Sequence, residues 1–484
     1  MLVADPAGVL CELISMTEGP TLAMRHAQGD DAIGMQRTET ICVAAATCLK
    51  NCVRVAMGNE GAGCVDLILD RVVNIVGSSA SVGIPGYIPS RIAHAQCCEI
   101  VAIVADKDFQ GRGERILKDV ALRLGNAISS SSCIDWSVPD RLCTGIVSIV
   151  RQRFSDCEFH HECDLRDLVS VLQCLPPTMH RTFAEAADSF VLGHQTTTIL
   201  VSICEVVHLL MEVLPHRGVF PHHHIDPPRE ADWMRLFVGL LQNIADRFEQ
   251  SVGDEGAQEG QTGQSDLVSV MGALGNILVL YAKRDSGSDN SVFLLQPYDL
   301  NDCDEPCDFR FEVCRLVWVI LQLVCQDDQC DDLTSQMICF ITHVVGTGMS
   351  EADVPDIIVF GLERIVDFAS SEEEEEEEEE DPQLFLFGEA EGKKKDLFDL
   401  LLATHHEFPA VTADTLSVFF TNTISEYEAG ASSKMWQRLS ICVSNNLTSS
   451  IRNIISNPTH TYIQIGIRAL TQQLLLSSSL ALIS

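Results

Sequence analysis

The histidines and cysteines with the best spacing for a metal site lie in two short stretches. Cys157, His160 and Cys163 are each separated by two residues, and His222, His223 and His224 are consecutive. A zinc finger needs a second ligand pair at a set distance, and a zincin helix needs a second histidine four residues on. Neither follows here, so we predict no metal site.

An acidic stretch that begins at Asp302 has the composition of a calcium loop. An EF-hand loop starting there would require glycine at position 307 and glutamate at position 313. The chain has Cys307 and Val313 at these positions. We therefore predict no calcium site.

Catalytic signatures are missing from the sequence as well. The glycines near residues 58–63 have the wrong order for a dinucleotide-binding turn, and Gly113 leads to no Lys-Ser or Lys-Thr pair. No serine nucleophile elbow is present. We predict that the chain is not an enzyme and that it needs no cofactor.

The most unusual side chains form an unbroken acidic run in residues 372–381. A run of like charges cannot be buried, and it attracts basic protein segments. We therefore predict that it contacts a partner. The candidate residues are Glu372, Glu373, Glu374, Glu375, Glu376, Glu377, Glu378, Glu379, Glu380 and Asp381.

The whole chain of 484 residues is acidic, with a net charge of -37. The acidic run supplies ten of these charges, so the acidity is expected to be global. Such a field attracts basic proteins and repels nucleic acid and anionic lipid. We predict a basic protein partner and no direct nucleic acid binding; the alternative is that the charge serves only solubility.

The 20 cysteines indicate a reducing compartment, because many lie in apolar helical patterns where a thiol acts as a small hydrophobe. The first residues show no secretory signal. The longest strongly apolar run, residues 316–325, is about half of the roughly 20 residues that span a bilayer. We predict no membrane insertion and a place in the cytoplasm and nucleus.

Apolar residues three and four positions apart recur through most of the chain, which predicts an all-α protein. Polar, glycine or proline breaks separate the patterns. The helices are expected at 39–56, 63–77, 90–105, 114–128, 138–154, 163–174, 178–191, 195–214, 230–251, 265–284, 308–326, 331–345, 353–369, 394–406, 411–428, 433–455 and 459–482.

Many helices joined by short turns predict an α-solenoid, since one amphipathic pair cannot bury its own apolar face. The spacing of about 40 to 47 residues a pair is that of HEAT or armadillo-like antiparallel helix pairs wound into a superhelix. A single large helical bundle is the alternative. We expect a poorly patterned segment at 1–36 and a continuous array at 37–484, with loops at 253–264 and 285–308 and an acidic insertion at 371–393.

Prolines and lysines mark individual boundaries. Pro139 follows Ser137 in a good first-turn arrangement. Pro176 and Pro177 are expected to end one helix, and Thr178 to cap the next. The lysines at 393–395 are expected at a helix start, with a nuclear localisation signal as the alternative.

Three stretches resemble the karyopherin-β superfamily of nuclear transport receptors, nearest the transportin-SR and importin-thirteen branch. Residues 168–180 read LVSVLQCLPPTMH and resemble a leucine-rich helix of that branch that ends in Leu-Pro-Glu-Glu. Residues 380–385 with 396–401 are similar to the acidic stretch, Asp-Pro and helix found midway along several importins. Residues 405–420 resemble the His-rich turn and aromatic helix of that branch.

The stretches also depart from the family pattern. Pro177 and Thr178 replace the two glutamates, and Phe419 and Phe420 replace a Trp-Tyr pair. Such receptors are usually about twice this length, and residues 1–130 match none of the family's Ran-contacting repeats.

The resemblance implies a function. The concave face of the superhelix, lined by the second helix of each pair, would hold basic or Arg/Ser-rich cargo, with Ran-GTP and nucleoporins as further partners. A HEAT-type scaffold without transport activity is the alternative.

Overall fold

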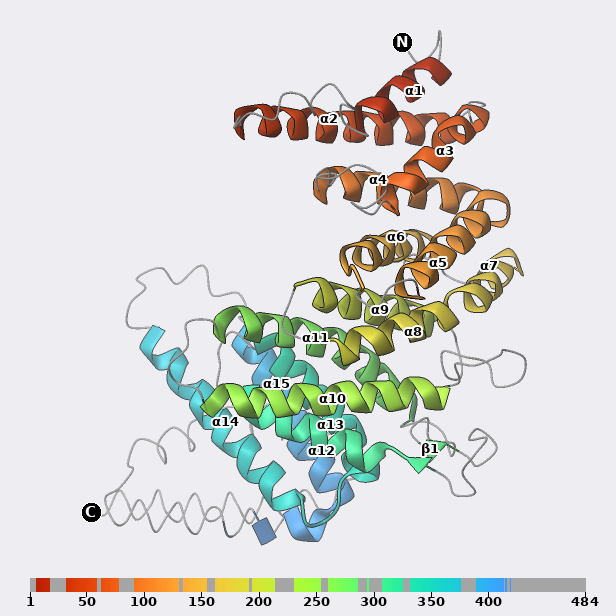
Figure 1. The fold of residues 1–484 in the computed structure, drawn as a ribbon. Coiled ribbons are helices and arrows are strands. Elements are labelled where there is room, and N and C mark those ends of the chain that lie inside the picture. The colour runs from red at the N-terminus through yellow and green to blue at the C-terminus, as the bar shows by residue number, and fades with distance from the viewer. Residues whose placement is uncertain are drawn as a thin grey trace. The chain divides into compact units, whose positions relative to one another are not determined.

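A computed structural model gives the architecture. It describes residues 6–17, 32–58, 62–77, 91–129, 134–154, 162–190, 194–213, 230–253, 260–285, 294–295, 307–324, 331–375, 389–412, 414–415 and 418. Within these ranges the chain is almost wholly helical (Figure 1). It forms two compact units, Met1–Phe309 and Arg310–Ser484.

The first unit contains eleven of the described α-helices and one π-helical turn. The helices are α1 (Pro6–Thr17), α2 (Ala32–Met57), α3 (Ala62–Val76), α4 (Arg91–Lys107), α5 (Glu114–Ser129), α6 (Ser137–Phe154), α7 (Glu162–Cys174), α8 (Pro176–Asp188), α9 (His194–Val213), α10 (Glu230–Gly253) and α11 (Gly260–Asp285). The π-helical turn η2 (Phe109–Gly113) lies between α4 and α5.

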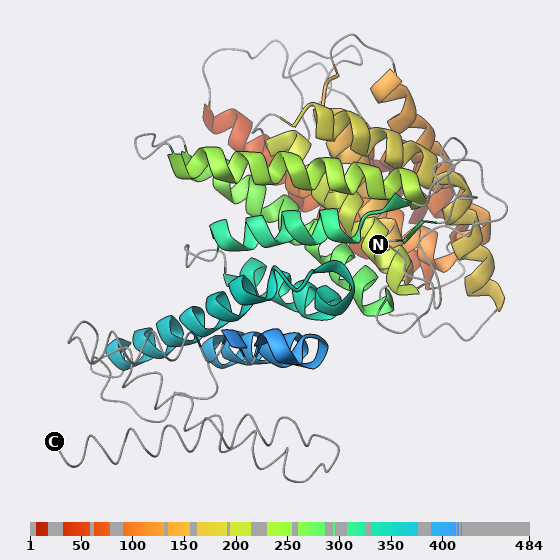
Figure 2. The same cartoon turned by 90° about the horizontal axis from the view of Figure 1, so that it is seen from below.

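These helices form two parallel layers. The second helices of successive pairs pack side by side in the order α2, α4, α6, α9 and α11. In the other layer α1 packs on α3, and α5 packs on α8, which in turn contacts α10. Figures 1 and 2 show this stacking of neighbours in the first unit. The predicted all-α solenoid of helix pairs is confirmed.

The core between the layers consists of apolar side chains at helical spacing. In α4 a row of residues from Ala93 to Ala105 is buried, and in α6 Leu142, Ile146 and Val150 are fully covered. Gly145 permits α6 to approach α3, because a Cβ there would lie 2.8 Å from Cγ1 of Val76.

An aromatic cluster joins α8 to α10. The ring centroid of Phe183 lies 5.6 Å from that of Phe237 and 6.0 Å from that of Trp233. All three side chains are buried. These rings therefore pack α8 of one helix pair against α10 of the next pair.

Helix α1 lies in the segment 1–36, where the sequence analysis expects little pattern. Leu10 and Ile14 are fully buried, and the helix packs on α2 and α3. Pro6 is compatible with helix because it occupies the first position, where a backbone N–H would have no helical partner. The expectation of a poorly patterned start is wrong for residues 6–17.

The second unit contains α12 (Arg310–Val324), α13 (Asp331–Gly348), α14 (Val354–Glu375) and α15 (Glu389–Glu407). Helix α13 packs on α12 and α15, and α14 packs on α15. Val354, Ile358 and Leu362 form a buried row on α14 that the side chains of Leu401 and Phe408 cover.

The helices predicted at 394–406 and 411–428 are separated by a break at Phe408 in the structure. Helix α15 ends at Glu407, and helical structure resumes at Pro409. The Phe408 amide donates to the Thr404 carbonyl at 2.9 Å, so the two segments stay joined by a backbone hydrogen bond.

Most predicted boundaries agree with the structure to within a few residues, but one predicted cap is wrong. Helix α8 begins at Pro176, with prolines in its first two positions, and Leu175 caps it without a side-chain hydrogen bond. Thr178 therefore lies inside the helix, where its carbonyl accepts from the Thr182 hydroxyl at 2.8 Å. Prolines fit the first turn because that turn leaves N–H groups unbonded.

The two predicted loops are shorter than expected. Helix α11 begins at Gly260, inside the loop predicted at 253–264. In the loop predicted at 285–308, β1 (Leu294–Leu295) pairs antiparallel with β2 (Cys307–Asp308). The helices predicted at 433–455 and 459–482, and most of that at 411–428, lie outside the described residues.

Candidate protein-binding surface

The acidic run continues a helix instead of starting as a loop. Helix α14 extends through Glu375, so residues 372–375 are helical, and α15 already begins at Glu389. Both ends of the insertion predicted at 371–393 are therefore helix. Residues 376–381, which complete the run, lie outside the described residues, and the lysines at 393–395 lie within α15 rather than at its first turn.

Acidic residues mark the outer face of α14 before the run begins. Asp356 and Glu363 are exposed and seven residues apart, which places them on the same face of the helix. This face of α14 is therefore acidic before residue 372 is reached.

The glutamates at the C-terminal end of α14 are unfavourable for this helix when no partner is bound. The C-terminal end of a helix carries a partial negative charge from its unbonded carbonyl groups. Glutamates at residues 372–375 add negative charge to that end. A cationic partner bound there would relieve both effects, which is the chemical argument for a basic ligand at this site.

The acidity is not global, which corrects the sequence analysis. Residues 1–154 contain 16 acidic and 14 basic residues, whereas residues 155–484 contain 53 acidic and 18 basic residues. The first three to four helix pairs are therefore close to neutral. Counting charge by segment would have revealed this from the sequence.

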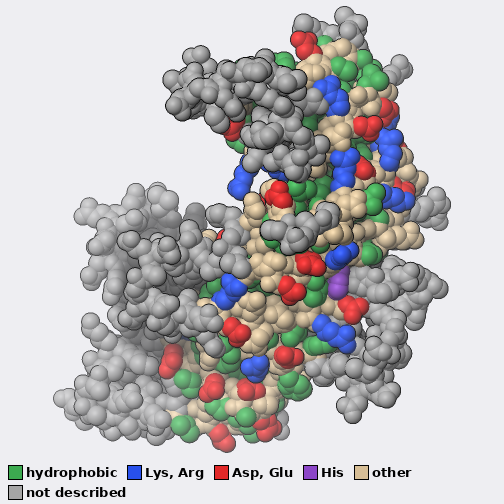
Figure 3. Space-filling model, viewed as in Figure 1, with side chains coloured by type: hydrophobic (Ala, Val, Ile, Leu, Met, Phe, Trp, Pro, Cys, Tyr) green, Lys and Arg blue, Asp and Glu red, His purple; other side chains and the backbone are tan. Residues whose placement is uncertain are grey.

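Charges in the neutral part pair with one another across the second-helix layer. Nζ of Lys50 on α2 lies 2.8 Å from Oε2 of Glu99 on α4. Arg151 on α6 pairs in the same way with Glu205 on α9. Figure 3 shows both signs of charge interspersed over the N-terminal helices. This part of the layer therefore does not present a uniformly acidic surface.

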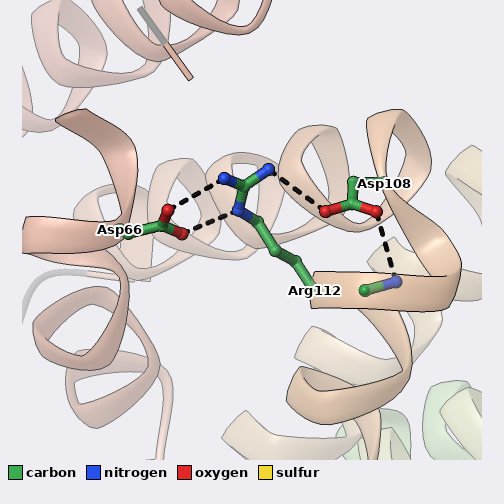
Figure 4. Close-up of polar contacts among 4 residues, drawn as sticks. Asp66, Asp108 and Arg112 are labelled. Atoms are coloured by element: carbon green, nitrogen blue, oxygen red, sulfur yellow. Dashed lines mark hydrogen bonds and ion pairs between the residues drawn. The ribbon is translucent and has the colours of Figure 1, made fainter. Parts of the chain in front are cut away.

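Arg112 forms the most extensive described polar contact between helices of the N-terminal part (Figure 4). Its Nε donates to Oδ1 of Asp66 at 2.7 Å and its Nη2 to Oδ2 at 2.8 Å. Its Nη1 donates to Oδ2 of Asp108 at 3.1 Å. The guanidinium therefore ties α3 to the end of α4, and this hydrogen bonding lowers the pKa of the Asp66 carboxyl and raises that of Arg112.

The π-helical turn η2 places Arg112 for this contact. The Asp108 carboxylate caps the turn by accepting from the Gly111 amide at 3.2 Å. A Cβ at Gly111 would lie 2.7 Å from the Asp108 carboxylate, and one at Gly113 would lie 2.9 Å from the Ala105 carbonyl oxygen. Glycine at both positions allows the turn to close. Since Asp108 and Arg112 both bond within the turn or to α3, we assign the turn a structural role.

A buried ion pair fixes α7 to α6. Nη2 of Arg153 lies 2.8 Å from Oδ2 of Asp167, and the two side chains are 16% and 5% exposed. Breaking one partner of such a pair leaves an uncompensated buried charge. This ion pair therefore holds α7 against α6. Helix α7 contains part of the first stretch that resembles the karyopherin-β family.

The histidines and cysteines that the sequence analysis rejected as metal ligands lie mostly outside the described part of the chain. It contains no group of three or more His, Cys, Asp or Glu side chains that could hold a metal ion. Cys163 lies in α7, whereas Cys157, His160 and residues 222–224 lie outside the described residues.

Several of the described thiols are buried and behave as hydrophobes, whereas Cys48 is exposed. Cys98, Cys143 and Cys204 are buried, and burial raises the pKa of each thiol so that it stays protonated. Burial also raises the pKa of Cys174 to about 11. A protonated thiol is a poor nucleophile and metal ligand, so these cysteines have a packing role.

Three described helices have the length and hydropathy of a membrane span: Glu39–Met57, Gln195–Val213 and Ser265–Lys283. The sequence analysis missed them because it searched for unbroken apolar runs, and these helices contain interspersed polar residues. The buried shares of the three windows are 33%, 56% and 50%. We return below to the low value for the first.

The fold and its surfaces define an all-α solenoid whose later part is strongly acidic. No family model matches the chain, and comparisons with curated proteins and with solved structures also give no match. The likeness to karyopherin-β therefore rests on the three sequence stretches.

Proposed function

We propose that this chain is a protein-binding α-solenoid that acts as a nuclear transport receptor of the karyopherin-β type. It holds basic or Arg/Ser-rich cargo under the control of Ran-GTP and works between cytoplasm and nucleus with nucleoporins. The observation that carries the proposal is the charge separation along a stack of helix pairs, with 53 acidic against 18 basic residues after position 154.

The physical basis is charge complementarity spread over an extended surface. A stack of helix pairs offers a long surface on which many weak contacts can add. In the second unit, Asp356 and Glu363 are exposed on α14, and the sequence continues with glutamates at the end of that helix. Binding that depends on such contacts is fast and weakens with salt.

The first test separates transport control from simple binding. The full chain is immobilised and offered Ran-GTP or Ran-GDP, and a receptor should retain mainly Ran-GTP. Bound Arg/Ser-rich peptide should then change its occupancy when Ran-GTP is added and not when Ran-GDP is added. Equal failure to bind both forms would refute the Ran-controlled part of the proposal.

A HEAT-type scaffold without transport activity is the second candidate. It is favoured by the N-terminal helices, where charges such as Lys50–Glu99 and Arg112–Asp66 are already paired. Ran is expected at the first repeats of a receptor, and this part offers no surplus of charge. A scaffold would bind its partner equally with either Ran nucleotide state.

A further inference from the structure

One side of α2 is apolar and uncovered. Ile41 and Val55 are 51% and 53% exposed, and Cys48 is exposed midway between them. Ala44 is also exposed, and Cys52 is half-buried. We call these five residues the α2 stripe. It contains no charged side chain, although most helix surfaces facing water do.

The stripe faces away from the neighbouring helix of its layer. Lys50 marks the side of α2 that faces α4, because it pairs with Glu99. At about 100° per residue, Ile41, Cys48 and Val55 lie roughly 140° to 200° around the helix from Lys50. Among the described helices α2 packs closely on α1, α3 and α4, so α2 is the end helix of its layer (Figure 1).

The apolar composition of α2 is typical of a helix that lies between two neighbouring helices of its layer. Its apolar window, Glu39–Met57, has a mean hydropathy of 1.3 but is only 33% buried. The comparable window Gln195–Val213 of α9 is 56% buried, because α9 lies between α6 and α11. Among the described helices, α2 therefore has a neighbour in its layer on one side only, which is α4.

We propose that a second copy of this chain is that neighbour, with the two α2 helices packed antiparallel about a twofold axis at Cys48. A twofold interface needs a self-complementary surface. Ile41 and Val55 lie seven residues on either side of Cys48, and Ala44 and Cys52 lie four. In antiparallel copies each large side chain faces the other large one, and the small side chains at the centre allow close approach.

Charge identifies this end as the place where two copies can meet. Each copy has a net charge of -37, so most approaches are repulsive. Residues 1–154 are nearly neutral, and the stripe itself has no charge. One helix packed against one helix falls short of the roughly 1,200 Å² of a standard interface, so the dimer is expected to be weak and reversible.

The test is the mass of the full chain in solution as a function of concentration. The wild-type mass should rise from 53.1 kDa toward twice that value between about 1 µM and about 200 µM. Val55→Glu should remain monomeric. Leu122→Glu is the matched control, because Leu122 is 63% exposed on α5, and it should dimerise like the wild type. Circular dichroism checks that both variants fold.

A cross-link tests the register. A short bismaleimide should join two copies through Cys48, and Cys48→Ser should lose this product while Cys52→Ser largely keeps it. A chain that stays monomeric throughout, or a dimer that Val55→Glu leaves intact, overturns the proposal. So does a monomer whose Cys48 resists alkylation, because another segment of the same chain would then cover the stripe.

Discussion

The Arg112 guanidinium donates two hydrogen bonds, of 2.7 and 2.8 Å, to the Asp66 carboxylate, although the two residues lie 46 positions apart in the sequence. Planar guanidinium and carboxylate groups match each other in this bidentate arrangement. The contact joins α3 to the turn after α4, so it fixes the two helices of this pair to each other.

Replacing Arg112 should destabilise the N-terminal helices. Arg112→Ala is expected to lower the free energy of unfolding by about 1 kcal/mol, since the pair is partly solvent-exposed and screened. Arg112→Lys should recover only part of the loss, because lysine cannot make the bidentate contact. Chemical denaturation measures both, with Lys118→Ala as the control for an exposed pair within one helix. Equal stability of Arg112→Ala and the wild type would show that the contact is not formed.

The same pair should contribute to sensitivity toward acid. The pKa of Asp66 is lowered from its ordinary value of 3.8, chiefly by the hydrogen bond from Arg112. Its contribution to stability is therefore complete above that ordinary value and is lost as the pH falls through the lowered pKa. Asp66→Asn should show a smaller loss of stability than the wild type in this range, measured by thermal unfolding. A parallel loss in both proteins would contradict the assignment.

His94 should make the fold weaker in mild acid. Its ring is buried, Nε2 lies 3.3 Å from the Val76 carbonyl, and Cys98 Sγ lies 3.8 Å away. Burial lowers the pKa of His94 from 6.5, and the charges of Arg141 and Asp140 partly offset each other there. The unfolded chain binds the proton more readily, so stability is present above about pH 6.5 and falls as the pH drops below it.

The comparison is between His94→Gln and His406→Gln. His406→Gln is the control for replacing an exposed histidine, because His406 is 77% exposed. His94→Gln is less stable at neutral pH but should lose less further stability between about pH 7.5 and about pH 5.5. An identical pH response in the wild type and His94→Gln would contradict this role of His94.

Gly145 tests the close contact between α6 and α3. Gly145→Ala would place a Cβ 2.8 Å from Val76, and such overpacking should cost about 1 to 3 kcal/mol. Gly239 on α10 has no atom within 4 Å of the corresponding Cβ position. Gly239→Ala should therefore be neutral or stabilise the fold by up to about 1 kcal/mol, through better helix propensity. Denaturant midpoints of the two variants should move in opposite directions; a matching shift would show that the helices are packed differently.

Deleting residues 372–381 should leave the thermal midpoint almost unchanged. Residues 372–375 form the C-terminal end of α14, where negative charge is unfavourable to the helix dipole, so we expect the deletion to cost little stability. Salt-sensitive binding of a basic peptide should weaken in the deletion variant. A large fall in the midpoint would instead show that the run is packed structure.

Helices could be predicted from the sequence because their apolar spacing is a local signal. Helix α1 was missed because it is short and Gly8 interrupts its pattern. The turn η2 was missed because its geometry depends on Asp108 and on room for Gly111, and neither produces a periodic pattern.

Contacts between helices could not be predicted in the same way. Lys50 and Glu99 lie 49 residues apart, and only the packing of α2 on α4 brings them together. The acidic run was identified from composition, but its start within a helix was not, because poly-Glu alone indicates an exposed loop as readily as a helix end. The uncovered side of α2 likewise becomes visible only once the neighbours of the helix are known.

The most direct test of the account is the affinity of the full chain for a fluorescent Arg/Ser-rich peptide, measured by anisotropy over a salt series. We predict saturable binding that weakens at least about tenfold from about 50 mM to about 300 mM NaCl. A peptide of the same length with acidic residues in place of arginine should not bind. Absence of binding at low salt, or binding that salt does not change, would contradict the claim that this solenoid recognises basic protein segments through its charge.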